Sequence, residues 1–171
     1  IDRNPENART VYVTDAQFQE VYDRADFVLQ DAMDLLLATS HNPSDILRLT
    51  RQDLADGTLW VRRGKTIKKV RFRVQGKLKG ALERILARPR AVSSVYLIAD
   101  ERGQPVKLDN LEKRFQKARG AAEWQLRDIR AKAVTDENDL RTASQRAGHA
   151  NEQITAEVYR RIKGDLVSPL N

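Results

Sequence analysis

The stretch from Arg127 to Tyr159 combines cations, a histidine and a tyrosine hydroxyl within a short length of chain. It contains Arg130, His149, which is one of only two histidines in the protein, and Tyr159 ten residues further on. Cleavage of a phosphodiester needs such groups, because cations stabilise the phosphate charge and a hydroxyl can attack the phosphorus. We therefore interpret this stretch as a candidate phosphate-cleaving site.

Each of these residues also has a plainer interpretation when taken alone. His149 follows Gly148, a natural helix stop, and is then a capping or solvent-exposed histidine. Tyr159 is then a packing residue of an amphipathic helix. Arg127 and Arg130, about one helical turn apart, are then solvated arginines. Asp128 is the predicted N-cap of their helix, and a helix N-terminus favours an anion.

Two segments in the N-terminal half supply further candidates. The first is Gly64-Lys65-Thr66, predicted to form the turn between two strands, where a lysine can reach a DNA groove as a point charge. The plain alternative is a surface lysine. The second is Thr39–Asp45 (T-S-H-N-P-S-D), which interrupts a helical pattern, with Asn42 as its expected N-cap and Pro43 in the first turn.

The composition favours a polyanionic partner. The chain of 171 residues carries a net charge of +7, with a pI near 9.9, and a basic folded domain suits DNA, RNA or an anionic membrane face. The absence of cysteine excludes disulfides and thiolate metal sites and suits a reducing cytosol. No apolar run approaches the roughly 20 residues that span a bilayer.

The helices and strands that must position these residues are expected to form a mainly α protein with a small antiparallel β-sheet, an α+β fold. Residues 1–13 are expected to be a linker from a missing upstream part of the protein, and residues 14–171 a single domain. The predicted helices cover 14–25, 27–37, 43–53, 76–86, 108–120, 128–137, 139–146 and 152–163. Strands are predicted at 58–61 and 69–74, and a short strand or extended run at 95–98.

In this order the motifs resemble the catalytic domain of tyrosine recombinases, the phage integrase family. The resemblance runs from about Asn4 to the end of the chain. D-I-R-A-K-A-V-T-D resembles the family's second box, with Arg130 as its arginine, and Ala147-Gly148-His149 resembles the L-G-H segment. Lys65 matches the hairpin lysine, and Tyr159 has suitable spacing for the nucleophile.

The chain departs from the family pattern at two functional positions. Asn42 occupies the place of the first catalytic arginine in T-G-x-R, and Ser40 the place of the glycine. Arg127 occupies the usual histidine place of the second box, while Asp45 keeps the acidic place. An asparagine offers one neutral donor instead of a bidentate cation. We expect its presence to cost at least roughly 3–4 kcal/mol of transition-state stabilisation, although Arg127, Arg48 or Arg51 could compensate in part.

The resemblance implies a mechanism without metal or cofactor. Tyr159 attacks a DNA phosphate, forming a 3′-phosphotyrosine and freeing a 5′-hydroxyl. Lys65 is the implied general acid, Arg130 and His149 hold the non-bridging oxygens, and Asp45 orients its neighbours. Arg127 can only stabilise charge, because an arginine is a poor base.

The resemblance also implies double-stranded DNA as the partner and a homo-oligomer on DNA, a tetrameric synapse, with no membrane association. It further implies that the missing N-terminal part is a DNA-binding domain, that residues 14–171 are the integrase catalytic domain, and that the protein acts in the cytoplasm of a bacterial or phage-infected cell. Further basic residues are expected to contact backbone phosphates and to make binding salt-dependent. They include Arg62, Arg63, Lys68, Lys69, Arg71, Arg73, Arg160 and Arg161.

Two alternatives to an active recombinase remain from the sequence. One is a non-catalytic DNA-binding module that keeps the recombinase fold, which Asn42 favours. The other is an unrelated basic helical domain that binds RNA or DNA, in which the motif order arose by chance. A covalent protein–DNA adduct distinguishes the first interpretation from both.

Overall fold

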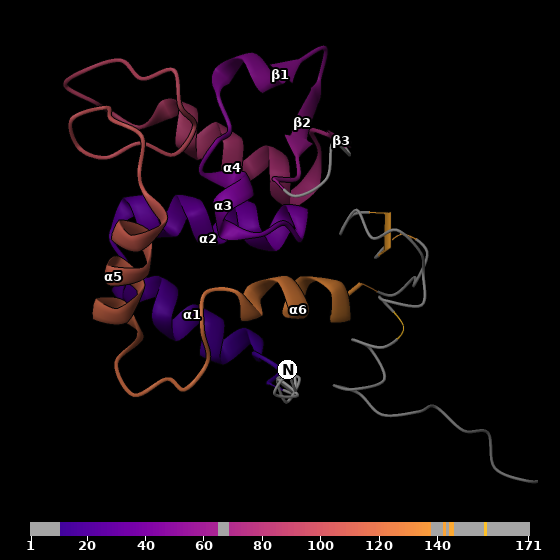
Figure 1. Cartoon of the computed structure of the whole chain (residues 1–171), viewed down its shortest axis with the longest axis vertical. Coiled ribbons are helices and arrows are strands. Elements are labelled where there is room, and N and C mark those ends of the chain that lie inside the picture. The colour runs from indigo at the N-terminus through magenta and orange to yellow at the C-terminus, as the bar shows by residue number, and fades with distance from the viewer. Residues whose placement is uncertain (1–10, 65–68, 138–141, 143, 146–155, 157–171) are drawn as a thin grey trace, which may run out of the picture.

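The computed structural model describes residues 11–64, 69–137, 142, 144, 145 and 156. It is helix-rich with a small antiparallel sheet, which confirms the predicted fold class. Figure 1 shows α2 and α3 lying between two groups: the sheet with α4 on one side, and α1 with α6 on the other. The helices are α1 (Asp15–Arg24), α2 (Phe27–Thr39), α3 (Pro43–Ile46), α4 (Gly76–Ala87), α5 (Leu108–Arg119) and α6 (Asp128–Thr135).

The central helix α2 is apolar on most of its surface, as a helix covered on several sides should be. Leu29, Met33 and Leu36 are fully buried, and α2 packs against α4, α5 and α6. The preceding helix, α1, begins with the predicted capping box, in which the Thr14 hydroxyl accepts from the Gln17 backbone N–H and the Gln17 side chain accepts from the Thr14 backbone.

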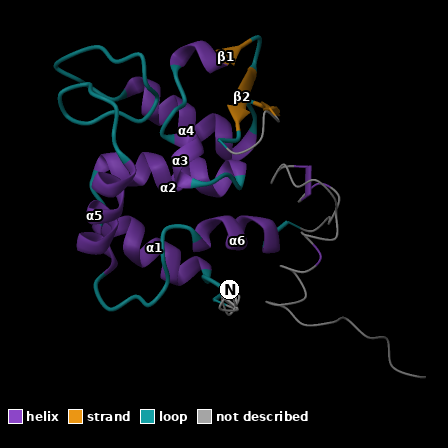
Figure 2. Cartoon of the chain, in the orientation of Figure 1, coloured by secondary structure: helices purple, strands orange, loops and turns teal. Residues whose placement is uncertain are grey.

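The sheet consists of β1 (Leu54–Ala55), β2 (Thr58–Arg62) and β3 (Lys69–Arg73), in the order β1-β2-β3 with both pairings antiparallel. Figure 2 shows the strands gathered at one end of the domain. The alternation along β2 buries Leu59 and Val61 and exposes Trp60 and Arg62. The pair β2 and β3 was predicted, whereas β1 was not, because a two-residue strand carries no alternation.

Three local predictions were wrong. The helix that begins at Pro43 ends at Ile46, and the chain continues as a turn and a 3₁₀ helix, Arg51–Asp53. Residues 95–98 form a single bridge, Thr50 to Tyr96, instead of a strand. The N-cap of α6 is Arg127, while Asp128 is its first residue and accepts a hydrogen bond from the backbone N–H of Gln125.

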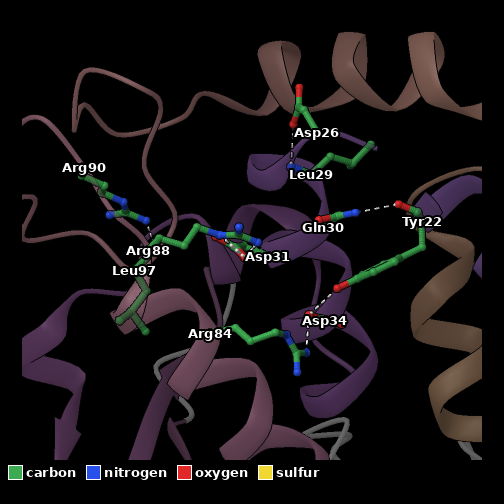
Figure 3. A network of polar contacts seen from close by, with 10 residues as sticks. All are labelled: Tyr22, Asp26, Leu29, Gln30, Asp31, Asp34, Arg84, Arg88, Arg90 and Leu97. Atoms are coloured by element: carbon green, nitrogen blue, oxygen red, sulfur yellow. Dashed lines mark hydrogen bonds and ion pairs between the residues drawn. The ribbon is translucent and has the colours of Figure 1, made fainter. Parts of the chain in front are cut away.

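Acidic side chains on α2 tie this helix to α4 and to the residue that follows it (Figure 3). Asp31 is 2% exposed and accepts from Nε and Nη2 of Arg88 at 2.6–2.9 Å. Asp34, one turn further along, accepts from Arg84 at 2.7 Å and from the Tyr22 hydroxyl at 3.0 Å. Burial raises the pKa of Asp31, and the bonds from Arg88 oppose that shift.

We expect Arg88→Ala to destabilise the fold by about 2–3 kcal/mol, because it leaves a buried carboxylate without its cation. The loss is below the roughly 3–5 kcal/mol of a fully buried pair, since the Arg88 side chain is itself 24% exposed. The matched change Arg84→Ala removes a pair whose arginine is 54% exposed and should cost at most about 1 kcal/mol. Urea unfolding of both variants checks the prediction, and equal losses would contradict it.

Candidate active site

The segment Thr39–Asp45 makes a sharp reversal between α2 and α3. Ser40 caps α2 in the left-handed conformation, with φ 56°, and donates its backbone N–H to Leu36. This conformation explains the glycine of the resembling motif, because glycine adopts positive φ without steric cost. A serine there carries a strain of about 1–2 kcal/mol. The reversal leaves Asn42 exposed at the start of α3, where its side chain makes no capping hydrogen bond.

His41, inside the same reversal, is fully buried. Its Nδ1 lies 2.9 Å from the carbonyl oxygen of Thr39, so Nδ1 carries the proton and donates it. The ring meets Phe72 of β3 edge-on, with centroids 5.6 Å apart. Burial lowers the pKa of His41, and the nearby positive charges of Arg130 and Arg63 lower it further. The imidazole is therefore neutral at pH 7 and fixes the reversal against the sheet.

This lowered pKa predicts a pH-dependent stability. Below the unfolded value of about 6.5 the unfolded chain binds a proton at His41 that the folded chain does not. The contribution of His41 to stability is therefore lost as the pH falls below about 6.5. We expect the wild type to lose more stability than His41→Gln between pH 7 and pH 5 in urea unfolding. Equal losses in the two proteins would show that His41 does not carry the effect.

Asp45 connects the reversal to the loop that precedes Lys65. Its carboxylate is buried, and Oδ1 accepts from the backbone N–H of Gly64 at 2.9 Å and from Nη2 of Arg48 at 2.7 Å. The guanidinium of Arg48 also covers Gly64, because a Cβ added there would lie 2.6 Å from its Nη2. The end of β2 is thus held beside the Thr39–Asp45 reversal.

Arg130 enters the same region from α6 and is half-buried. Burial is the largest cause that lowers its pKa, to about 10; the positive charge of Arg63 lowers it further, and Asp45 opposes the shift. The guanidinium remains charged at pH 7. Arg63 and Asp45 therefore act electrostatically on Arg130, and all three groups act on His41.

A cavity of about 700 Å³ is lined by both Asn42 and Arg127. Glu112 of α5 also lines it. The other two arginines considered as replacements for the missing cation are already engaged: Arg48 pairs with Asp45, and Nε of Arg51 donates to the carbonyl oxygen of Ser94 at 2.9 Å. The structure thus brings positions 42 and 127 to one cavity. Asp45 belongs to the same Thr39–Asp45 reversal as Asn42, and Arg130 lies near this reversal.

The remaining site predictions fall in part outside the described residues. Lys65, His149 and Tyr159 lie outside them, as do Lys68, Arg160 and Arg161. The predicted helices at 139–146 and 152–163 fall largely there as well. The predicted catalytic positions that the structure describes are Asn42, Asp45, Arg127 and Arg130.

The outer face of the sheet is basic. Arg62 pairs with Lys69 and Trp60 pairs with Arg71 across β2 and β3, and Arg73 is also exposed. The Arg71 guanidinium lies 5.4 Å from the Trp60 ring centroid. Like charges directly opposite each other destabilise a strand pair, so this face favours an anionic partner that neutralises them.

Within the described ranges, no cluster of three or more histidine, aspartate or glutamate side chains could hold a metal ion. In the same part of the chain, no helix is both long and apolar enough to cross a membrane.

The model of the phage integrase family matches residues 10–164, nearly the whole chain. The chain belongs to the phage integrase family. A lambda integrase dimer bound to a COC′ core site matches with a TM-score of 0.80 at 18% identity, over 97% of this chain and 52% of that one. The lambda integrase catalytic core matches at 0.66 and 17%, over 88% and 91%. No curated protein matches in sequence.

The fold of this family member also matches that of XerA recombinase, with a TM-score of 0.66 at 20% identity over 89% of this chain and 60% of that one. This chain spans about half the length of the DNA-bound lambda integrase.

The sequence did not predict a place for His41 in the site or the position of Arg63 beside it. The burial of His41 depends on Phe72, about 30 residues away in the sequence, so no local sequence pattern predicts it.

Proposed function

We propose that this chain is the catalytic domain of a site-specific DNA recombinase that cleaves and rejoins strands through a 3′-phosphotyrosine at Tyr159. The observation that carries the proposal is the hydrogen bond from the Gly64 N–H to Asp45. It joins the segment before Lys65 to the Thr39–Asp45 reversal, beside Arg130. Segments widely separated in sequence meet around a cationic site, as phosphoryl transfer requires.

In this mechanism the Tyr159 oxygen attacks the phosphorus and the bond from phosphorus to the 5′-oxygen breaks. Lys65 donates a proton to the departing 5′-oxygen, and the tyrosine proton passes to an acceptor at the site. Arg130, His149 and Arg127 stabilise the negative charge on the non-bridging oxygens, while Asp45 positions its neighbours. Attack by a 5′-hydroxyl on the phosphotyrosine reverses the step and rejoins a strand.

The partner in this proposal is double-stranded DNA, bound by a homo-oligomer. Solved relatives include a lambda integrase dimer on a core site and a lambda integrase tetramer on a Holliday junction. The basic outer face of the sheet supports DNA binding through backbone phosphates. In this proposal residues 14–171 form the catalytic domain, acting in the cytoplasm, and Val13 directly before them is fully buried in its core.

A nicked suicide DNA substrate tests the proposal, because loss of the short fragment beyond the nick traps the covalent intermediate. We expect a protein–DNA adduct that survives denaturant, detected by gel shift. DNA affinity measured at several salt concentrations serves as the control for binding and should fall linearly on a log–log plot. Binding without any adduct would overturn the recombinase proposal.

The second candidate is a DNA-binding module that has lost strand cleavage, and Asn42 is the observation that favours it. An amide at this position cannot form the bidentate, charged contact of an arginine with a phosphate. If the chain is such a DNA-binding module, the wild type binds DNA without forming a covalent adduct. Restoration of adduct formation by Asn42→Arg would then show that position 42 alone limits the chemistry.

A further inference from the structure

We propose that Arg63 is a catalytic residue of this domain, supplying to the scissile phosphate the second guanidinium that position 42 lacks. The inference rests on the proposed function and identifies how the site can work with Asn42. It assigns different roles to Arg63 and its neighbour Arg62, whereas the sequence alone predicts that both contact backbone phosphates.

The alternation of β2 separates the two arginines. Leu59 and Val61 face the core, whereas Trp60 and Arg62 face outward. Arg63 follows the strand on the side of Val61, and it is half-buried where Arg62 is exposed. Arg62 therefore belongs to the basic outer face of the sheet, whereas Arg63 is half-buried directly after β2, a strand that α3 contacts.

The backbone next to Arg63 is fixed at the site. The N–H of Gly64 donates to Asp45, and the Arg48 guanidinium lies against Gly64. A side chain one residue before this anchored point has a restricted range of positions, all close to the Thr39–Asp45 reversal. A guanidinium placed in advance in this way costs little reorganisation when charge develops in a transition state.

The charges around Arg63 favour an anion. Arg63 and Asp45 both act electrostatically on Arg130, and Arg63, Asp45 and Arg130 all act on His41. Asp45 also pairs with Arg48. Three guanidinium groups and one carboxylate give this cluster a formal charge of +2, while His41 is neutral. Two half-buried guanidiniums can grip the non-bridging oxygens of one phosphate, with parallel N–H donors that suit its geometry.

The other arginines near position 42 fit this role less well. Arg48 is bound to Asp45 and Arg51 to the Ser94 carbonyl. Arg127 lines the cavity with Asn42 but is exposed, and it shares that cavity with Glu112. Arg63 is the described arginine that combines partial burial with a direct influence on Arg130.

The test compares Arg63→Gln with Arg62→Gln on the suicide substrate, measuring both the dissociation constant and the cleavage rate at saturating DNA. We expect Arg63→Gln to lower the saturated rate roughly 10²–10³-fold with little change in the dissociation constant. For Arg62→Gln we expect the opposite result, a higher dissociation constant with little change in the cleavage rate at saturating DNA. The slope of log affinity against log salt concentration should be reduced by about 1. Thermal unfolding confirms that both variants fold.

The double variant Asn42→Arg, Arg63→Gln completes the test, because an arginine at 42 should restore the rate that Arg63→Gln loses. Wild-type cleavage that is unaffected by Arg63→Gln would overturn the inference and leave the proposed function intact. Adduct formation by Asn42→Arg but not by the wild type would also overturn it, since Arg63 then fails to replace the missing cation. If neither protein forms an adduct, the proposed function fails, and this inference with it.

Discussion

Replacement of Tyr159 with phenylalanine is expected to abolish the covalent protein–DNA adduct while leaving DNA affinity nearly unchanged. The change removes only the hydroxyl oxygen that attacks the phosphorus, and no other group of the ring can form the phosphotyrosine. The aromatic ring and its packing remain. The gel-shift assay with the suicide substrate measures adduct formation, and fluorescence anisotropy of labelled DNA measures affinity.

The three other tyrosines provide matched controls, because the chain contains only four. Burial and the charge of Asp34 raise the pKa of Tyr22 to about 12, and its hydroxyl donates to Asp34. The hydroxyl of Tyr12 donates to Asp136 at 2.7 Å, a bond that raises its pKa. Both shifts oppose the formation of a tyrosinate, whereas a nucleophile must lose its proton readily.

We therefore expect Tyr12→Phe, Tyr22→Phe and Tyr96→Phe each to retain the adduct. Persistence of the adduct in Tyr159→Phe, or its loss in one of the other three folded variants, would assign the nucleophile to a different residue. The comparison also tests the choice of nucleophile made from the spacing between His149 and Tyr159, for which the described residues give no geometry.

The elements that the sequence predicted well are those whose signals are local. Thr14 and Gln17 specify the start of α1 because the two reciprocal bonds of a capping box involve residues three apart. The end of α4 is equally local, because Pro89 disfavours the helical conformation of Arg88, which caps α4 in an extended conformation. The end of α3 at Ile46 was missed because the apolar residues that continue the helical pattern, Leu47 and Leu49, are buried by tertiary contacts in a turn instead.

The same distinction separates the predicted and unpredicted parts of the site. The positions of Asp45 and Arg130 followed from motifs read along the chain. The bond between Gly64 and Asp45, however, joins residues 19 apart, and no pattern within either segment encodes it. The different environments of Arg62 and Arg63 could have been derived, because the alternation of β2 already places successive residues on opposite faces.

Arg130→Gln is expected to reduce the rate of adduct formation roughly 10²–10³-fold at saturating DNA, because it removes a preorganised cation from the developing charge on the phosphate. Arg130→Lys is the more informative variant, since it keeps a cation but loses the planar fork of donors. The surroundings of Arg130 lower its pKa from 12.5 to about 10, through burial and then the repulsion of Arg63.

A lysine begins from a pKa near 10.4, and the burial and repulsion that lower the pKa of Arg130 should lower the pKa of the lysine below this value. The charged form binds the phosphate, and it is lost as the pH rises through the pKa. The lysine variant should therefore lose activity as the pH rises toward 9, whereas the guanidinium of Arg130 in the wild type stays charged over this range.

The rate of cleavage at limiting DNA, measured against pH, reports the ionisation of the free protein. Arg130→Gln lacks a titrating group at this position and controls for every other ionisation, including those of Tyr159 and Lys65. The ratio of the lysine variant to the glutamine variant should fall toward one as the pH rises from 7 to 9. A ratio that stays constant over this range would show that residue 130 does not lie in the desolvated cationic cluster with Arg63, and a glutamine variant as active as the wild type would remove Arg130 from the site.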